Sequence, residues 1–192
     1  MKLRVLATTA AVVGTLTFAA CGSESKSASE ATAAPTAGAF NDADVAFAQG
    51  MIPHHEQAVE MAAIALDPTV GASAQVRDLA TRIKAGQDPE ITLMSGWLTA
   101  WGQPLTMDGH DMSSMEGMMS AEEMNALGAL TGAEFDKMWL TMMSRHHEGA
   151  IAMALTVKAN GSNSDVLALA DQVVAAQQAE IDEMSALLAT AG

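Results

Sequence analysis

The chain has 192 residues and a formal net charge of −14, with 49% hydrophobic and only 4% aromatic residues. Such an acidic chain argues against nucleic acid or an anionic membrane surface as a partner, because both are negatively charged. The charge is compatible with attracting cations, and also with solubility alone. The apolar content rests on Ala, Leu and Met, which favour helix, and the length suits one domain after a leader.

Residues 1–20 are predicted to be a lipoprotein signal peptide. Two basic residues are followed by an apolar run that is short for a membrane span. The chain's one cysteine, Cys21, follows Phe-Ala-Ala in a context that resembles a bacterial lipobox. We predict lipidation at Cys21, with cleavage of a plain secretory peptide near Ala20 as the alternative. Residues 21–40, rich in Ser and Ala, would form a flexible tether, so that only the lipid would contact a membrane.

The domain at residues 41–192 is predicted to be almost wholly helical. Apolar periodicity, caps and turn residues predict four long helices and a short one, over about residues 41–66, 72–101, 120–130, 131–158 and 165–189. Capping boxes are predicted at Asn41, Ser120 and Thr131. Kinks are expected at Pro53 and Pro89, because proline removes a backbone donor inside a helix.

The two halves of this domain repeat one another. Residues 51–62 and 143–154 both read Met-x-x-His-His-Glu-x-Ala-apolar-x-Met-Ala, and the helices that follow them also match. Two helical hairpins that each carry one apolar face bury those faces best by packing together. The repeat therefore predicts an all-α four-helix bundle with a pseudo-two-fold axis, and a short extra helix in a Met-rich central connection.

Four of the five histidines lie in the repeated motif as adjacent pairs. Helical periodicity gives each pair one histidine facing the bundle interior and one at its flank, with methionines before and after. The alternative is a buried histidine bonded to a carboxylate or carbonyl, with methionine as core filler. Imidazole with thioether favours copper, above all Cu(I), with Ag(I) as a possible mimic. The predicted metal ligands are Met51, His54, His55, Met61, Met143, His146, His147 and Met153.

Two Gln–Glu pairs occupy equivalent inner positions on the second helix of each hairpin. We expect them to orient the histidine rings by hydrogen bonding. Direct ligation and an ordinary polar layer are the alternatives, and whether the two histidine pairs form one shared site or two is open. These residues are Gln87, Glu90, Gln177 and Glu180.

A second group of methionines lies in the Gly-, Asp- and Ser-rich connection between the halves. We predict a separate Cu(I) site there, with an amphipathic helix as the alternative that Gly and Ser disfavour. Thioethers do not titrate and imidazole does near pH 6.5, so acid is expected to weaken the histidine sites and spare this loop. The predicted loop ligands are Met107, His110, Met112, Met115, Met118 and Met119.

At these residues the chain resembles the family catalogued as domain of unknown function 305, which includes CopM-like copper-binding proteins. The matching stretches are residues 47–66, 117–124 and 135–154, and the resemblance covers about residues 41–189. It implies a ferritin-like bundle, a periplasmic or cell-surface location, copper binding and copper tolerance.

The sequence leaves two main functions open. The first is an extracytoplasmic lipoprotein that sequesters Cu(I) or exchanges it with an unknown partner protein. The alternative is a copper- or iron-dependent oxidase on a ferritin-like bundle, although the Glu-x-x-His pairs of di-iron bundles are missing and no other catalytic constellation is recognisable. A structural surface bundle that uses methionine only for packing is a third possibility. We therefore expect a binding protein rather than an enzyme.

Overall fold

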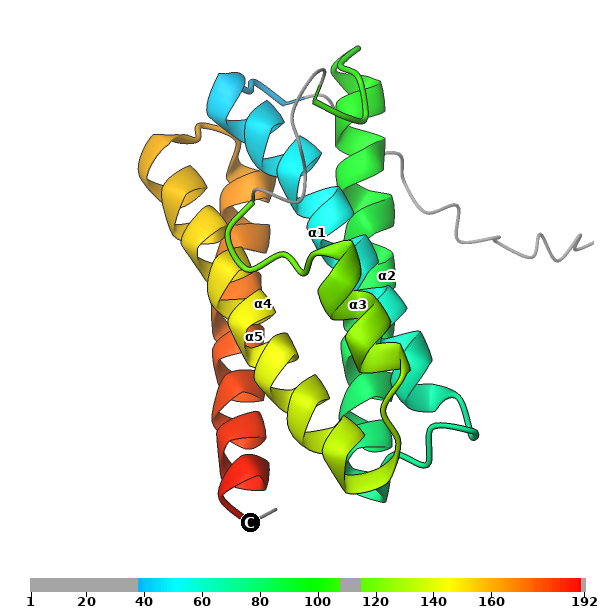
Figure 1. The fold of residues 1–192 in the computed structure, drawn as a ribbon. Helices are drawn as coiled ribbons and strands as arrows, with labels where there is room; N and C mark the ends of the chain where they lie inside the picture. Colours follow the sequence, from blue (N-terminus) through cyan, green and yellow to red (C-terminus); the bar gives the residue numbers. More distant parts are fainter. Residues whose placement is uncertain (1–37, 108–114, 191–192) are drawn as a thin grey trace, which may run out of the picture. The chain divides into compact units, whose positions relative to one another are not determined.

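Helices account for most of the part of the chain that the structure, a computed structural model, describes: residues 38–107 and 115–190. In chain order they are α1 (Asp42–Leu66), α2 (Ala74–Ala100), α3 (Ala121–Gly128), α4 (Gly132–Asn160) and α5 (Ser164–Thr190) (Figure 1). All begin and end within two residues of the predicted bounds. An all-α fold with a short helix between two hairpins is therefore confirmed. Pro53 and Pro89 lie inside α1 and α2, which continue through both, and a kink at either stays a prediction.

Two of the three predicted capping boxes are present. The Asn41 side chain accepts hydrogen bonds from the backbone N–H groups of Ala43 and Asp44, and the Asp44 carboxylate accepts from the Asn41 N–H at 2.8 Å. Ser120 and Glu123 exchange the same pair of bonds at the start of α3. These caps satisfy N–H groups that have no partner inside the helix, which is why the helices begin at these residues.

The third predicted box, at Thr131, is wrong in its chemistry although α4 does begin there. The Thr131 side chain makes no capping hydrogen bond. Gly132, the next residue, has a φ of +59°, and its N–H donates instead to the carbonyl of Val70 at 2.9 Å. Because a capping box requires helical backbone immediately after the cap, the left-handed turn at Gly132 prevents Thr131 from reaching its partner.

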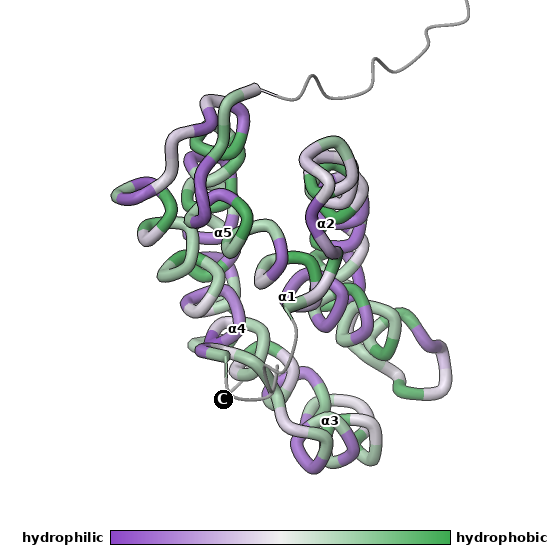
Figure 2. Tube along the Cα trace, turned by 90° about the horizontal axis from the view of Figure 1, so that it is seen from above, coloured by the Kyte–Doolittle hydropathy of each residue, from purple (hydrophilic) through white to green (hydrophobic). Residues whose placement is uncertain are grey.

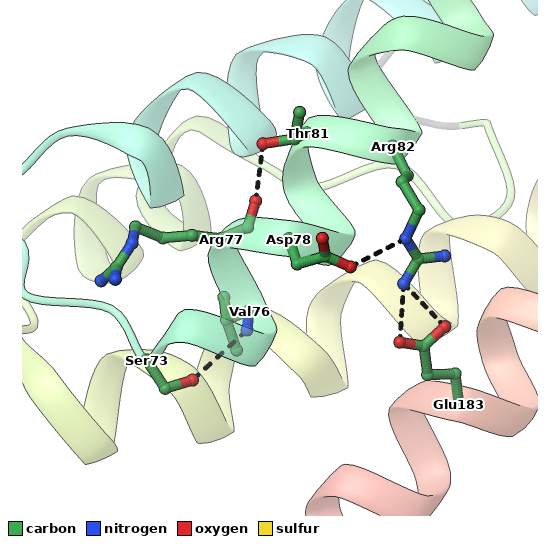
Figure 3. A network of polar contacts seen from close by, with 7 residues as sticks. All are labelled: Ser73, Val76, Arg77, Asp78, Thr81, Arg82 and Glu183. Atoms are coloured by element: carbon green, nitrogen blue, oxygen red, sulfur yellow. Dashed lines mark hydrogen bonds and ion pairs between the residues drawn. The ribbon is translucent and has the colours of Figure 1, made fainter.

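The two hairpins pack side by side through their first helices. The α1 helix lies along α2, α4 lies along α5, and α1 contacts α4 (Figure 2). Buried Asp44 of α1 links the hairpins, because it accepts backbone hydrogen bonds from Ser162 and Asn163 in the α4–α5 turn. Arg82 of α2 donates to both carboxylate oxygens of Glu183 of α5 at 2.6 and 2.8 Å (Figure 3). This exposed ion pair bridges the two second helices.

The interior consists of two apolar clusters. We name them by their tryptophans. Members of the Trp97 cluster include Phe47, Met51, Met94, Trp97, Leu98, Ala150, Ala154, Leu169 and Val173. Members of the Trp139 cluster include Ala58, Met61, Leu79, Ile83, Phe135, Trp139, Leu140, Met143 and Met184. On α1 the residues before the histidine pair belong to the Trp97 cluster and those after it to the Trp139 cluster, and on α4 this order is reversed.

A buried polar layer therefore crosses the middle of the bundle between the clusters. Its buried members are His54, His55, Gln87, His146, His147 and Gln177. Within the two described ranges, no helix combines the length and apolarity that crossing a membrane would need. The described residues all belong to one compact unit, which carries this layer at its centre.

Candidate metal centre

All four repeated histidines are fully buried, each with 0% of its surface exposed. They come from α1 and α4, and the ring centroids of His54 and His146 lie 3.8 Å apart. The prediction that one histidine of each pair lies at the flank is therefore wrong. Periodicity placed His54 at the edge of its own helix, but the facing helix and the segment before α3 cover that edge.

His55 and His147 each contact the second helix of their own hairpin, and we call them the outer histidines. They are held in the same way in both hairpins. His55 Nε2 lies 2.6 Å from a carboxylate oxygen of Glu90, and His147 Nε2 lies 2.7 Å from one of Glu180. Because a carboxylate accepts, Nε2–H is the donor, and a neutral ring then presents its Nδ1 lone pair. Both Nδ1 atoms are buried and have no hydrogen-bond partner among the described residues.

His54 and His146, whose rings lie next to each other, are called the inner histidines. They differ from one another in their hydrogen bonds. His54 donates from Nε2 to the backbone carbonyl of Glu116 at 3.2 Å, which again leaves Nδ1 free. His146 makes no hydrogen bond at either ring nitrogen to any described residue. Buried polar atoms without partners are rare and costly in native proteins, and they require an explanation such as a bound ion or water.

Burial keeps the inner rings neutral. Desolvation lowers the pKa of His54 to about 3, with a smaller opposing effect from the Glu116 carbonyl and a further lowering by His55 and His147. Desolvation also lowers the pKa of His146 well below its ordinary value, and the charges of the neighbouring histidines add to this, while the backbone of His54 has a smaller opposing effect. A neutral imidazole is the form that binds a metal ion, so the environment holds both rings in the competent state.

The glutamines of the layer do not contact the histidine rings by a hydrogen bond. Both amide atoms of Gln87 and the amide oxygen of Gln177 are buried without a described partner. They line a small pocket of about 40 Å³ between α2 and α5, together with Glu90 and Glu180. The glutamates therefore make the contacts that an orienting role requires, whereas the glutamines face this pocket.

A backbone segment at residues 115–119, which we call the cover, lies over the inner histidines. Gly117 has a φ of +84° and packs against the backbone of α4 at Gly149. A Cβ at Gly149 would lie 2.1 Å from the carbonyl oxygen of Glu116, so only glycine allows this approach. The sequence analysis missed Glu116 and Gly149, although the repeat contained a signal: Gly149 stands where the first half has Gln57.

The predicted methionine ligands lie in three places. Met51 belongs to the Trp97 cluster, and Met61 and Met143 belong to the Trp139 cluster, all three fully buried. Met153 is partly exposed and lies beside Gly50, where it meets two methionines of the connection.

The predicted loop ligands are also divided. Met107 and Met115 reach Gly50 from the connection. Met118 is partly exposed, and Met119 packs in the Trp139 cluster with its sulfur 2.7 Å from the Arg145 guanidinium. The remaining predicted residues, Cys21, His110 and Met112, lie outside the described residues.

The donor set fits a soft metal better than a hard one. In residues 38–107 and 115–190, no three side chains among His, Cys, Asp and Glu come together as a metal site would require. Zinc and di-iron sites need such groups. Imidazole nitrogens combined with thioethers form the set that Cu(I) prefers, and the layer offers several free imidazole nitrogens between clusters that contain methionine.

The comparison with known proteins identifies relatives among solved structures. A DUF305 protein from Streptomyces coelicolor, named as a secreted protein, is 35% identical with a TM-score of 0.74, covering 78% of this chain and 94% of its own. A DUF305 fragment from Deinococcus radiodurans is 33% identical with a TM-score of 0.71, covering 81% and 99%. No curated protein sequence shows significant similarity to the chain.

The structures of CopM are also similar. CopM in its Cu(II)-bound form is 29% identical with a TM-score of 0.65, over 77% of this chain and 96% of its own. It has further been solved in Cu(I)-bound, Ag-bound and apo forms. The model described as Domain of unknown function (DUF305) matches residues 44–188. This match, together with the relatives above 30% identity, shows that the chain belongs to the DUF305 family.

Proposed function

We propose that the protein binds copper as Cu(I) through the histidine layer between its two apolar clusters. The observation that carries this proposal is that Nδ1 of His54 and both ring nitrogens of His146 are buried without a hydrogen-bond partner among the described residues. An apolar or fully hydrogen-bonded layer would be more stable in the absence of a ligand, because each unsatisfied buried group costs about 1–3 kcal/mol. A metal ion bound by these nitrogens accounts for that cost.

The geometry supports binding rather than catalysis. The layer is closed by α2, α5 and the cover, and all four rings have no solvent exposure. None of the solved relatives described above is named as an enzyme, and several are copper- or silver-bound forms of CopM. A ferritin-like oxidase finds no support in the described residues, because the carboxylate-rich ligand set of a di-iron site is missing.

We further propose that Met51 and Met143, one turn before the histidine pairs, supply thioether ligands when metal binds. The glutamates Glu90 and Glu180 would keep Nε2–H engaged, so that the opposite Nδ1 faces the metal. Whether one ion bridges the pairs or each pair holds its own depends on rearrangement of rings whose Nδ1 atoms are now free.

The proposed location is the outer face of the cytoplasmic membrane, with the protein anchored through a lipid on Cys21. The supporting observations are the leader-like residues 1–20 and the single cysteine, together with a solved relative named as secreted. There the protein would sequester Cu(I) or exchange it with another protein, which contributes to copper tolerance. Replacing Cys21 with Ala and fractionating cells tests the anchor: equal solubility of wild type and variant would exclude it.

The sharpest test of copper binding is His146→Leu. Because the ring of His146 has no hydrogen bond to the residues that the structure describes, this change removes two unsatisfied atoms and leaves none of those residues without its partner. The apo protein should be as stable as wild type or more so, while Cu(I) affinity in a competition titration falls at least about tenfold, as for the loss of a ligand. Met142→Leu on the same buried face is the matched control and should leave affinity unchanged. Full affinity in the His146→Leu variant would refute the assignment.

A further inference from the structure

We infer that Met107, Met115 and Met153 form a second soft-metal site, built from thioethers alone, around Gly50. This site extends the proposed copper-binding function but is distinct from the histidine layer in its ligands and in its access to solvent. The sequence placed these three methionines in two different groups, and only the fold brings them together.

The convergence is visible around the α-carbon of Gly50. A Cβ built at Gly50 would lie 3.2 Å from Met115 Cε, 3.7 Å from Met107 Cε and 3.7 Å from Met153 Sδ. The ends of three thioether side chains, from two parts of the connection and from α4, therefore occupy one small volume. Cu(I) and Ag(I) are soft cations that thioether sulfur binds well, whereas Zn²⁺ and hard cations prefer other donors.

The glycine itself argues for a built site. Gly50 lies inside α1, where glycine costs about 1 kcal/mol relative to alanine. The equivalent position of the second repeat is Met142, which fills the core with its own side chain. In the first repeat, the missing side chain makes the room that the three methionine ends now take.

Ordinary core packing does not account for Met107 and Met115, although Met153 packs against the Trp97 cluster. The methionines that pack the two apolar clusters, such as Met51, Met61, Met94 and Met184, are fully buried. Met107 and Met115 belong to neither cluster, and all three members of the Gly50 group keep partial exposure. Met153 also lines a pocket of about 410 Å³ between α1 and α4, so a metal ion can reach its sulfur from solvent.

The methionine group around Gly50 lies beside the histidine layer. Gly50 lies one helical turn before His54 on the same face of α1. Met115 is directly followed by Glu116, whose carbonyl accepts the hydrogen bond of His54. A metal ion held at Gly50 would therefore sit at the solvent-side edge of the cover, next to the buried imidazoles.

The test uses the full chain with Cys21→Ser in every variant, so that the thiol does not bind the probe. Ag(I), which does not change oxidation state, is titrated into Met107→Leu/Met115→Leu/Met153→Leu and into a matched control, Met94→Leu/Met124→Leu/Met138→Leu. The first triple variant should lose one Ag(I) equivalent and the control none. Unchanged stoichiometry and affinity in the first variant would overturn the inference.

A second measurement keeps the two sites apart. One equivalent of Cu(I) bound to His146→Leu should give an X-ray absorption spectrum with sulfur neighbours, and a spectrum without sulfur would overturn the inference. If the triple variant does not fold by circular dichroism, Met107→Leu alone decides, with an expected loss of at least tenfold in Ag(I) affinity. Failure of the histidine proposal would show as full Cu(I) affinity in His146→Leu, whereas failure of this one would show as unchanged Ag(I) binding in the methionine variants or as a spectrum without sulfur.

Discussion

The two hairpins carry the same motif but hold their histidines differently. The outer rings are equivalent, because His55–Glu90 and His147–Glu180 have nearly the same length, 2.6 and 2.7 Å. The inner rings are not, because His54 bonds to the carbonyl of Glu116, whereas His146 has no hydrogen-bond partner among the described residues. The glutamates belong to the repeat and so occur twice. The cover belongs to the single connection between the halves, and its backbone can present that carbonyl to only one ring.

The cover also contacts the two halves at equivalent positions by different means. On α1, the Gln57 side chain exchanges two hydrogen bonds with the backbone of Met119, at 2.7 and 2.9 Å. On α4, the equivalent residue is Gly149, against which the Glu116–Gly117 backbone packs directly. One half therefore holds the cover by a side chain and the other by the lack of one. The two halves therefore differ in sequence where they contact the cover, because this one segment must fit against both of them.

The largest expected effect comes from filling the glycine side of this contact. Gly149→Ala would place a Cβ 2.1 Å from the Glu116 carbonyl oxygen, so the cover must shift, and the free energy of unfolding should fall by about 3 kcal/mol. Gly86→Ala in α2 is the control, because nothing lies within 4 Å of its Cβ position. It should gain up to about 1 kcal/mol from helix propensity. Urea unfolding measures both, and equal stabilities would show that the cover does not pack on α4.

The next effect follows from the neutral inner rings. The folded pKa of His54, about 3, lies below the unfolded value of 6.5, so the unfolded chain binds the proton more tightly. The stability that neutral His54 contributes to the fold is therefore fully present above about pH 6.5 and is lost as the pH falls toward 3. Between pH 6.5 and 5, protonation of His54 in the unfolded chain should lower the free energy of unfolding of the apo protein by about 2 kcal/mol. Urea unfolding at both pH values should show this slope in wild type and a smaller one in His54→Leu. A slope that persists unchanged in the variant would contradict the prediction.

This pKa also changes the expectation about acid and copper. The sequence-based expectation assumed an unperturbed imidazole, which at pH 5 would hold a proton in place of copper. In the folded protein, protons compete little for His54 at that pH. Acid should therefore weaken copper binding at the inner rings mainly by destabilising the fold.

A third prediction tests the symmetric part of the comparison. Glu90→Gln and Glu180→Gln each replace a carboxylate acceptor by an amide at the same histidine nitrogen. Because the two contacts match, each change should lower Cu(I) affinity by a similar factor of about tenfold. Competition titration of the two single variants measures the factors. A tenfold difference between them would show that the halves are not equivalent in the metal-bound state.

The smallest expected effect concerns Gly50, where the second half has Met142. Gly50→Ala places a Cβ 3.2 Å from the flexible end of Met115, which can move aside. Replacing a glycine inside a helix should raise apo stability by about 0.5–1 kcal/mol, while the displaced thioether lowers Ag(I) affinity. Thermal unfolding should show the gain in stability, and Ag(I) titration should show the loss of affinity. A variant that gains both stability and affinity would exclude a role for Gly50 in making room for metal.

The sequence by itself determined the helices, their pairing and the positions that form the buried polar layer. Period, caps and turns are local signals, and the repeated His-His motif with its Gln–Glu partners shows which positions face the centre. It failed at Thr131, where Gly132 adopts a left-handed turn and donates its N–H to distant Val70, so that the local cap does not form. It also failed at the flank of the histidine pairs. Both failures have one cause: a contact from elsewhere in the chain changed what a helix position alone implied.

Only the tertiary structure decided which nitrogens of the layer are free and which methionines meet. Glu116 reaches His54 because Gly117 adopts a left-handed turn and Gly149 lets the backbone approach. Met107, Met115 and Met153 meet because the connection folds back over Gly50. Periodicity describes one helix at a time, whereas these contacts depend on where a long connection crosses two packed helices. That path is set by steric fit and burial between residues far apart in the chain.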